Sequence, residues 1–291
     1  MALPSLRVRA HDAVEIMDSP LCDPTMLTRT YQDFRVVNAV VSGWWGIYRR
    51  SIRPALSTTT ELTLLDVGSG GGDVSRALAG WAVRDGLRLR VTGVDPDARA
   101  HVFVTSQPKI AGLSFRRALS SDLVAEGEHF DFVVSNHVLH HLSVDELKGL
   151  LVDSEALARR RVLHADLERS NCAYLGFAAG TWPFFRHSYI RPDGLTSIQR
   201  SYTANELRAA VPVGWTVSRG RPSRLELSWN APTQAVPADA SPEFATNAAT
   251  LAGGDPGRAP APAADAPEET VKRPGSEPDH VPEFTPDRPD A

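Results

Sequence analysis

Two apolar runs of this chain end in a carboxylate, and a glycine-rich turn follows the first of them. The first run, residues 62–67, ends around Asp66 and leads into residues 68–72. The second run, residues 88–95, ends at Asp95. Glycine lets the backbone turn sharply and lets a ligand lie against it, and an acid at the end of the second strand suits ribose hydroxyls. We therefore expect a strand–turn–helix–strand unit that holds a nucleoside-containing cofactor.

The spacing of the glycines separates the candidate cofactors. Gly68, Gly70 and Gly72 give the pattern G-x-G-x-G, whereas the dinucleotide fingerprint is G-x-G-x-x-G. Counted from Gly68, the third required position is Asp73. A carboxylate there suits a ligand with a cationic end better than a pyrophosphate. The turn therefore disfavours an NAD(P)-dependent oxidoreductase, which we keep as an alternative function.

A third block, residues 130–142, reads Phe-Asp-Phe-Val-Val-Ser-Asn-His-Val-Leu-His-His-Leu. Together with the glycine turn and Asp95, it resembles the motifs of class I S-adenosylmethionine (SAM)-dependent methyltransferases, in particular the small-molecule enzymes of the ubiquinone and menaquinone type. The resemblance covers about residues 60–229. It implies SAM as cofactor and methyl transfer to a hydroxyl or an activated carbon of a small, aromatic or polyketide-like metabolite.

The resemblance also implies which residues bind the cofactor. The side of the methionine moiety is expected to be formed by Asp66, Gly68, Ser69, Gly70, Gly72, Asn136, His137, Tyr31 and Arg35. The adenosine side is expected to be formed by Asp95 at the ribose hydroxyls, Pro96 against the adenine, and Leu119 and Asp122 in the loop after the third strand.

Three histidines are candidates for the catalytic base. His140 and His141 follow the fourth strand, and a histidine of near-neutral pKa suits the deprotonation of a phenol; the competing interpretation is that these rings only pack under the sheet. His187 lies near Arg186 and Arg191, which could hold an acidic acceptor. We expect no metal, because residue 136 is Asn with no acid beside it.

Alternating apolar runs and helical patterns predict an α/β fold with a parallel sheet and helices on both faces. We expect a Rossmann-like, seven-stranded, mostly parallel sheet with a C-terminal antiparallel hairpin. The predicted strands are 62–67, 88–95, 113–117, 130–136 and 160–166, with the hairpin at 215–218 and 224–229. The predicted helices are 24–41, 44–53, 73–84, 97–106, 143–157 and one that starts at residue 203.

The chain divides into three predicted parts. Residues 1–58 form a helical arm that acts as a lid. Residues 59–229 form the methyltransferase domain, with an aromatic-rich insertion at about 168–200 that binds the acceptor. Residues 230–291 hold 12 of the 22 prolines, with eleven acids and four bases, which is typical of a disordered tail.

Composition narrows the partners and the compartment. The net charge of -4 over 291 residues suits no polyanion, so we expect a small-molecule acceptor and no nucleic acid. Two cysteines cannot build a disulfide framework, which favours the cytoplasm. The chain has no apolar run of 18 residues, so we expect no membrane span. We also expect a monomer or a homodimer. A non-catalytic SAM-binding interaction protein that uses the acidic tail is the further alternative.

Overall fold

A seven-stranded sheet forms the centre of the computed structural model, which describes residues 4–232. The strands follow the spatial order β3-β2-β1-β4-β5-β7-β6. Their bounds are β1 Leu62–Val67, β2 Leu89–Val94, β3 Leu113–Arg116, β4 Phe130–Asn136, β5 Ala158–Leu167, β6 Thr216–Gly220 and β7 Arg224–Asn230.

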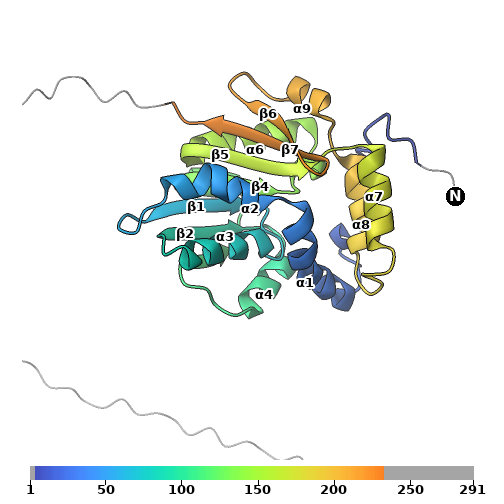
Figure 1. Cartoon of the computed structure of the whole chain (residues 1–291), viewed down its shortest axis with the longest axis horizontal. Coiled ribbons are helices and arrows are strands. Elements are labelled where there is room, and N and C mark those ends of the chain that lie inside the picture. The colour runs from blue at the N-terminus through green and yellow to red at the C-terminus, as the bar shows by residue number, and fades with distance from the viewer. Residues whose placement is uncertain (1–3, 233–291) are drawn as a thin grey trace, which may run out of the picture. The chain divides into compact units, whose positions relative to one another are not determined.

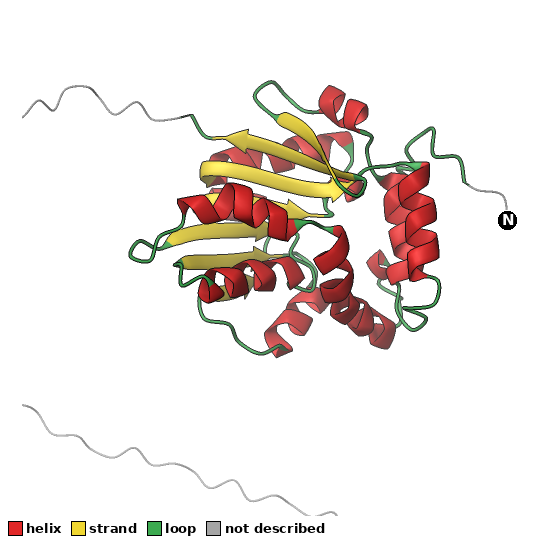
Figure 2. Cartoon of the chain, in the orientation of Figure 1, coloured by secondary structure: helices red, strands yellow, loops and turns green. Residues whose placement is uncertain are grey.

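The direction of the strands decides where functional groups gather. Strands β1 to β5 are parallel, with Leu64 opposite Phe132 in the β1–β4 pair. Strand β7 runs antiparallel to both β5 and β6 (Figure 2). Because parallel strands end at the same edge of a sheet, the carboxyl ends of β1, β2, β4 and β5 meet at one edge, where open α/β sheets bind ligands. The predicted fold class is confirmed.

Helices cover both faces of the sheet (Figure 2). The helices are α1 Pro24–Val41, α2 Trp44–Ile47, α3 Asp73–Arg84, α4 Ala98–Ser106, α5 Ser120–Ala125, α6 Val144–Leu157, α7 Asn171–Thr181, α8 Ile190–Arg200 and α9 Ala204–Ala210. Side chains alternate across a strand, so Leu64 packs with α2 and α3 on one face while Leu65 packs with α5, α6 and α9 on the other.

Local sequence signals explain where several helices begin. Asp23 caps α1 by accepting a hydrogen bond from the Met26 amide at 2.8 Å, and Pro24 occupies the first position of the helix, where no N–H is needed. Ser143 and Glu146 form a capping box at the start of α6, as Thr203 and Glu206 do for α9. Such caps satisfy the free amide groups of a first turn.

The predicted second helix of the arm is divided into three short pieces. Helix α2 ends at Ile47, a π-helical turn spans Tyr48–Ile52, and a 3-10 turn spans Arg53–Ala55. Helices α5, α7 and α8 were not among the predicted elements. The last two form the insertion after β5 and lie beside each other beyond the carboxyl edge of the sheet (Figure 1).

The segment before α1 is held by buried charged groups rather than by regular structure. A 3-10 turn spans Ile16–Asp18, and its first amides, those of Ile16 and Met17, donate to the carboxylate of Asp193 in α8 at 2.8 and 2.9 Å. Arg9 donates to the carbonyls of His140 and Leu142, both at 3.0 Å. This contact fixes the N-terminal segment against the turn after β4.

The predicted tail falls on residues 233–291, outside the described part of the chain. Within the described residues, no helix is long and apolar enough to cross a membrane.

The glycine turn predicts a difference between two substitutions. Gly68 and Gly127 both adopt left-handed backbone, with φ of 67° and 71°, where any Cβ costs roughly 1–2 kcal/mol. A Cβ at Gly68 would lie 2.6 Å from Cγ2 of Val138, whereas one at Gly127 would meet nothing within 4 Å. We expect Gly68→Ala to lower the free energy of unfolding by about 1–3 kcal/mol more than Gly127→Ala. Urea unfolding of both variants measures this, and equal losses would contradict it.

Candidate active site

A cleft of about 380 Å³ opens at the carboxyl edge of the sheet. Its walls come from the glycine turn after β1, the ends of β2 and β4, helix α1 and the segment before it. Predicted site residues that line it are Gly68, Ser69, Gly70, Asp95, Pro96, Asn136, His137, Tyr31, His140 and His141. Residues that line it without having been predicted are Glu15, Met17, Asp18, Phe34, Asn38, Gly71, Asp73, Asp97, Ala100, Val138 and Ser197.

The turn after β1 holds the carboxylate of Asp95 in place. The Gly70 amide donates to Oδ2 of Asp95 at 2.8 Å, and the Asp97 amide donates to Oδ1 at 2.9 Å. Each carboxylate oxygen has further lone pairs, so Asp95 retains acceptor capacity toward the cleft. Tyr31 packs on the turn from α1, with its Cβ 3.0 Å from where a Cβ of Gly71 would stand.

Two further carboxylates lie on the other side of the same turn. Asp66 is 1% exposed and accepts a hydrogen bond from Oγ of Ser75 at 2.5 Å. Burial raises its pKa to about 7, and the nearby Asp73 and Asp95 add to the rise. Asp73 accepts from Nδ2 of Asn38 at 2.8 Å, and burial raises its pKa too.

Within the described residues, Asp66, Asp73 and Asp95 form no salt bridge with a cationic side chain. Burying several carboxylates together is costly unless a positive charge accompanies them. Since Asp66 is buried and Asp73 and Asp95 are half-buried beside the glycine turn, a cationic ligand would be favoured there.

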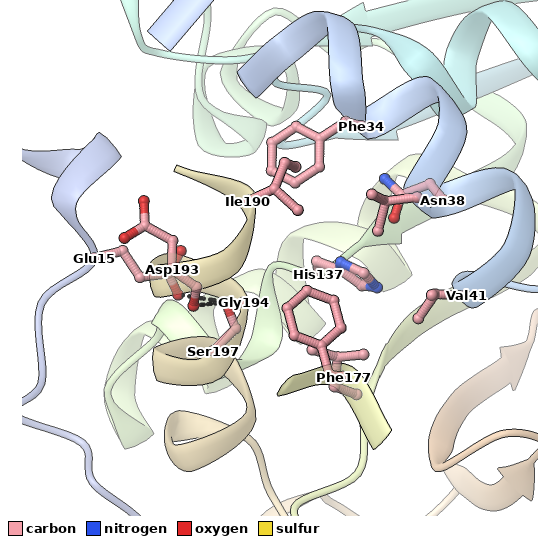
Figure 3. Close-up of a pocket in the computed structure, with 12 residues that line it drawn as sticks. Glu15, Phe34, Asn38, Val41, His137, Phe177, Ile190, Asp193, Gly194 and Ser197 are labelled. Atoms are coloured by element: carbon pink, nitrogen blue, oxygen red, sulfur yellow. Dashed lines mark hydrogen bonds between the residues drawn. The ribbon is translucent and has the colours of Figure 1, made fainter. Parts of the chain in front are cut away.

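His137 lies at the boundary between this cleft and a second, smaller cavity. It adopts left-handed backbone, with φ of 57°, and its amide donates to the Ala165 carbonyl at 2.9 Å. Burial lowers the pKa of its imidazole to about 4, so the ring is uncharged at neutral pH. In Figure 3 the ring lies between Asn38 and Val41 on one side and Asp193 with Ser197 on the other.

The second cavity lies next to an apolar pocket of about 570 Å³ between α1 and α7. Four residues line both of these spaces: Val37, Val41, Leu167 and Phe177. The pocket is further lined by Val36, Val40, Cys172, Ala173, Gly176, Gly180, Thr181, Phe184, Phe185, Ile198, Pro222 and Ser223, with no charged side chain among them. Its composition suits an apolar ligand.

His140 differs from the base that the sequence suggested. Its Nδ1 lies 2.7 Å from Oδ1 of Asp166 at the end of β5, and its Nε2 lies 3.3 Å from Oε1 of Glu15. Although burial alone would lower it, the two carboxylates raise the pKa of His140 to about 9, and the pKa values of Asp166 and Glu15 fall to about 2. A 1% exposed imidazole whose pKa is raised suits the role of a near-neutral base less well than the sequence suggested, and a catalytic role for His140 stays a prediction.

His141 keeps contact with the cleft. Its side chain is 31% exposed, and it lies 3.7 Å from Glu15 and 3.3 Å from Asp18.

The predicted site residues that do not line the cleft are Asp66, Gly72, Arg35, Leu119, Asp122 and His187. The Leu119 amide donates to Oδ2 of Asp122 at 2.8 Å, which caps α5, so the loop predicted to flank the adenine is the start of a helix. Gly72 adopts left-handed backbone under Phe115. Arg35 lines a neighbouring pocket beside Trp44 and Trp81.

His187 is also remote from the cleft. It lies in an exposed depression with Arg29, Asp33 and Arg186. That depression shares Val36, Phe184 and Phe185 with the apolar pocket, so His187 is placed at the outer rim of the pocket and not at the cofactor cleft.

Sequence reasoning missed the residues before α1, above all Glu15. The sequence shows Glu15 only as an acid in a short segment without regular structure. That alone does not indicate where in the fold its side chain lies. Asn38 was missed as well, although it lies one turn after Arg35 on the same helix.

The sheet order with an antiparallel last hairpin, the glycine turn and the acid after β2 together define a nucleoside-binding α/β domain of the methyltransferase class. Residues 65–163 match the family model described as a methyltransferase domain, Methyltransf_11. This stretch is therefore similar to a methyltransferase domain, and the resemblance drawn from the sequence motifs is confirmed.

Known proteins agree with this assignment. The chain is 38% identical over 88 residues to a ubiquinone biosynthesis O-methyltransferase of Methylobacterium sp. (strain 4-46). The alignment covers 28% of this chain and 31% of the relative, so the chain spans less than a third of the length of that curated relative.

Two solved structures share the fold at low identity. Human N-acetylserotonin methyltransferase in complex with SAM is 11% identical with a TM-score of 0.50, over 72% of this chain and 57% of that chain. The CurJ carbon methyltransferase is 15% identical with a TM-score of 0.51, over 72% and 61% of the two chains.

The buried Asp66 predicts a pH dependence of stability. Its pKa is about 7 in the folded chain against 3.8 as the ordinary value, so the folded state binds the proton more tightly. Its contribution to stability is therefore complete below about pH 4 and is lost as the pH rises to about 7. In Asp66→Asn this loss is absent. We expect the stability of the wild type relative to the variant to fall by on the order of 2–4 kcal/mol between pH 4.5 and 7.5.

Urea unfolding at several pH values measures this difference. Asp145→Asn, which changes an acid with 93% exposed side chain, is the matched control and should follow the wild type. Parallel curves for the wild type and Asp66→Asn would contradict the prediction.

Proposed function

We propose that this protein transfers a methyl group from SAM to a hydroxyl or an activated carbon of a small, apolar metabolite. The observation that carries the proposal is the adjacency of three spaces, the cleft at the glycine turn, the small cavity beside His137, and the apolar pocket between α1 and α7, each of which shares lining residues with the next. This arrangement would give the methyl donor and the acceptor separate, neighbouring binding regions.

The charge of the cleft supports SAM as the cofactor. SAM carries an ammonium and a sulfonium group, and the carboxylates of Asp66, Asp73 and Asp95 surround the glycine turn without a cationic partner among the described residues. The cationic end of the cofactor would offset part of their burial cost. Asp95, held by the Gly70 and Asp97 amides, would accept hydrogen bonds from the ribose hydroxyls.

Asn136 is placed to support the methionine moiety. Its Oδ1 accepts a hydrogen bond from Nε1 of the buried Trp44 at 3.0 Å, which fixes the orientation of the amide at the end of β4.

Both of the solved structures described above are named as methyltransferases, and that of the human enzyme contains SAM.

The apolar pocket supports an apolar acceptor. Its lining carries no charged side chain, and it shares Val37, Val41 and Phe177 with the small cavity beside the cleft. Since the sulfonium is already an activated leaving group, the protein needs mainly to align the acceptor with the methyl group and to exclude water. Val37, Val41 and Phe177 would help to align the acceptor and to exclude water.

We assign His137 a role in the chemistry where the cleft and the small cavity meet. It is the imidazole that faces both the cleft and the small cavity, and it is uncharged at neutral pH because burial lowers its pKa. It can accept a hydrogen bond from an acceptor hydroxyl and orient the oxygen toward the methyl group. We assign His137 this role in place of His140.

Radioactive methyl transfer tests the proposal as a whole. The full chain is incubated with methyl-labelled SAM and a panel of apolar phenols and 1,3-dicarbonyl compounds, and label in the extracted products is counted. We expect transfer to at least one class of compound, with S-adenosylhomocysteine formed in equal amount. Calorimetry with SAM and with NADH separates the alternatives, because binding of NADH without SAM would favour an oxidoreductase.

Replacement of Asp95 is expected to weaken the binding of SAM. Asp95→Ala removes a charged acceptor of hydrogen bonds, each worth about 1.5–3 kcal/mol. We expect the dissociation constant of SAM to rise by roughly 10- to 100-fold or more. Calorimetry on the folded variant measures it, with Asp145→Ala as a control at an exposed acid. An unchanged affinity would exclude the ribose contact.

Replacement of His137 is expected to lower turnover without lowering the affinity for SAM. We choose His137→Asn because Asn tolerates left-handed backbone better than most residues, so the turn after β4 is kept. Removal of the group that orients the acceptor oxygen is expected to lower kcat by roughly 10²-fold, while the dissociation constant of SAM changes little. His129→Ala, at an exposed site before β4, is the control. Unchanged kcat in His137→Asn would contradict the assignment.

A further inference from the structure

Three side chains with metal-binding atoms converge on the wall of the cleft opposite the glycine turn. Oε1 of Glu15 lies 3.3 Å from Nε2 of His140 and 3.7 Å from Nε2 of His141, and the ligand atoms all lie within 4.8 Å of one another. Ligand atoms that share one metal ion at about 2.0–2.2 Å lie roughly 3–3.5 Å apart. The cluster therefore has close to the spacing of a metal site.

The outward nitrogens of both imidazoles are held by carboxylates. Nδ1 of His140 lies 2.7 Å from Asp166, and Nδ1 of His141 lies 3.3 Å from Asp18. Metal-bound histidines almost always pair their other ring nitrogen with a carboxylate, a carbonyl or water, which orients the ring and strengthens its ligand nitrogen. Here both rings have such a partner, and both direct Nε2 toward Glu15.

The contact between Nε2 of His140 and the carboxylate of Glu15 is an ion pair without good hydrogen-bond geometry. The side chain of His140 is 1% exposed, and among the described residues its Nε2 makes no hydrogen bond of acceptable geometry. A buried polar atom without a partner is costly. A metal ion between His140 and Glu15 would satisfy it.

The backbone that carries the two histidines is rigid. Arg9 donates to the carbonyls of His140 and Leu142, and Arg200 donates to those of His140 and His141 at 3.3 and 3.2 Å. Glu15 is held in turn by Oγ of Ser197, which donates to its Oε1 at 2.8 Å. Such support fixes the ligands before a metal arrives.

We propose that Glu15, His140 and His141 bind one divalent transition-metal ion, with Asp166 and Asp18 as the partners that orient the two histidines. Two imidazoles and one carboxylate suit Zn²⁺ or Fe²⁺ and do not suit Mg²⁺ or Ca²⁺, which prefer oxygen ligands. All three ligands line the cleft, so a bound ion would be accessible from it. This site departs from the sequence-based expectation of no metal, which considered only the ends of β4 and β5.

The role of the ion, unlike its binding, rests on the proposed function. A hydroxyl acceptor coordinated to it would lose its proton to water, because a bound cation lowers the pKa of an oxygen ligand. The oxygen's electron pair would then form the bond to the methyl carbon while the carbon–sulfur bond breaks and its electron pair stays on sulfur. The products are the methyl ether and S-adenosylhomocysteine.

Metal binding is tested on the full chain without SAM, so that its result does not depend on methyl transfer. The untagged protein is treated with EDTA, dialysed and titrated with ZnCl₂ by calorimetry, and with CoCl₂ by visible absorption. We expect one saturable equivalent of Zn²⁺ and the visible bands of a nitrogen- and oxygen-ligated Co²⁺. Titration with MgCl₂ should show no comparable binding.

Variants assign the ligands. Glu15→Gln keeps the shape of the side chain, and His141→Ala changes a partly exposed residue; each should weaken Zn²⁺ binding by more than 100-fold. Asp18→Asn should weaken it by roughly 10- to 100-fold, as loss of an orienting partner does. His129→Ala should bind as the wild type does, and thermal melts confirm that each variant is folded. Absence of saturable Zn²⁺ binding, or binding unchanged in Glu15→Gln and His141→Ala, would overturn the proposal and leave a buried ion pair.

Discussion

The burial of carboxylates at one edge of the sheet is the constraint on which the rest of this structure depends. Parallel strands bring Asp66, Asp95 and Asp166 to that edge, where helices α1, α7 and α8 and the segment before α1 cover them. An unpaired buried carboxylate is costly. Each therefore needs a backbone amide, a hydroxyl or a cation nearby.

The two halves of this edge provide partners for their carboxylates in different ways. At β1 and β2 the glycine turn supplies an amide to Asp95, and Ser75 supplies a hydroxyl to Asp66, but the positive charge is left to a ligand. At β5 the positive charge comes from the chain itself as long as no metal ion is bound, since His140 lies between Asp166 and Glu15. The first half is thereby suited to binding a cationic cofactor, and the second to fixing the N-terminal segment over it.

The N-terminal segment is part of the site because it bridges elements that are far apart in sequence. Asp193 of α8 accepts the first amides of the turn at Ile16–Asp18, and Arg9 reaches the turn after β4. These contacts place Glu15 and Asp18 beside the histidines. The apolar pocket lies elsewhere, between α1 and α7.

The sequence by itself determined the sheet, the glycine turn and Asp95, because these follow from local rules: strand periodicity, glycine in left-handed backbone, and acids at strand ends. It also determined helix starts with capping residues, such as Asp23 and Ser143. It did not determine the state of His140, because protonation depends on Asp166 and on Glu15, which is 125 positions away in the chain. Nor did it determine that Leu119 and Asp122 cap a helix, since the same residues satisfy a loop pattern. Only the tertiary structure decided which charges face one another, because their energies depend on burial and distance, neither of which a local pattern contains.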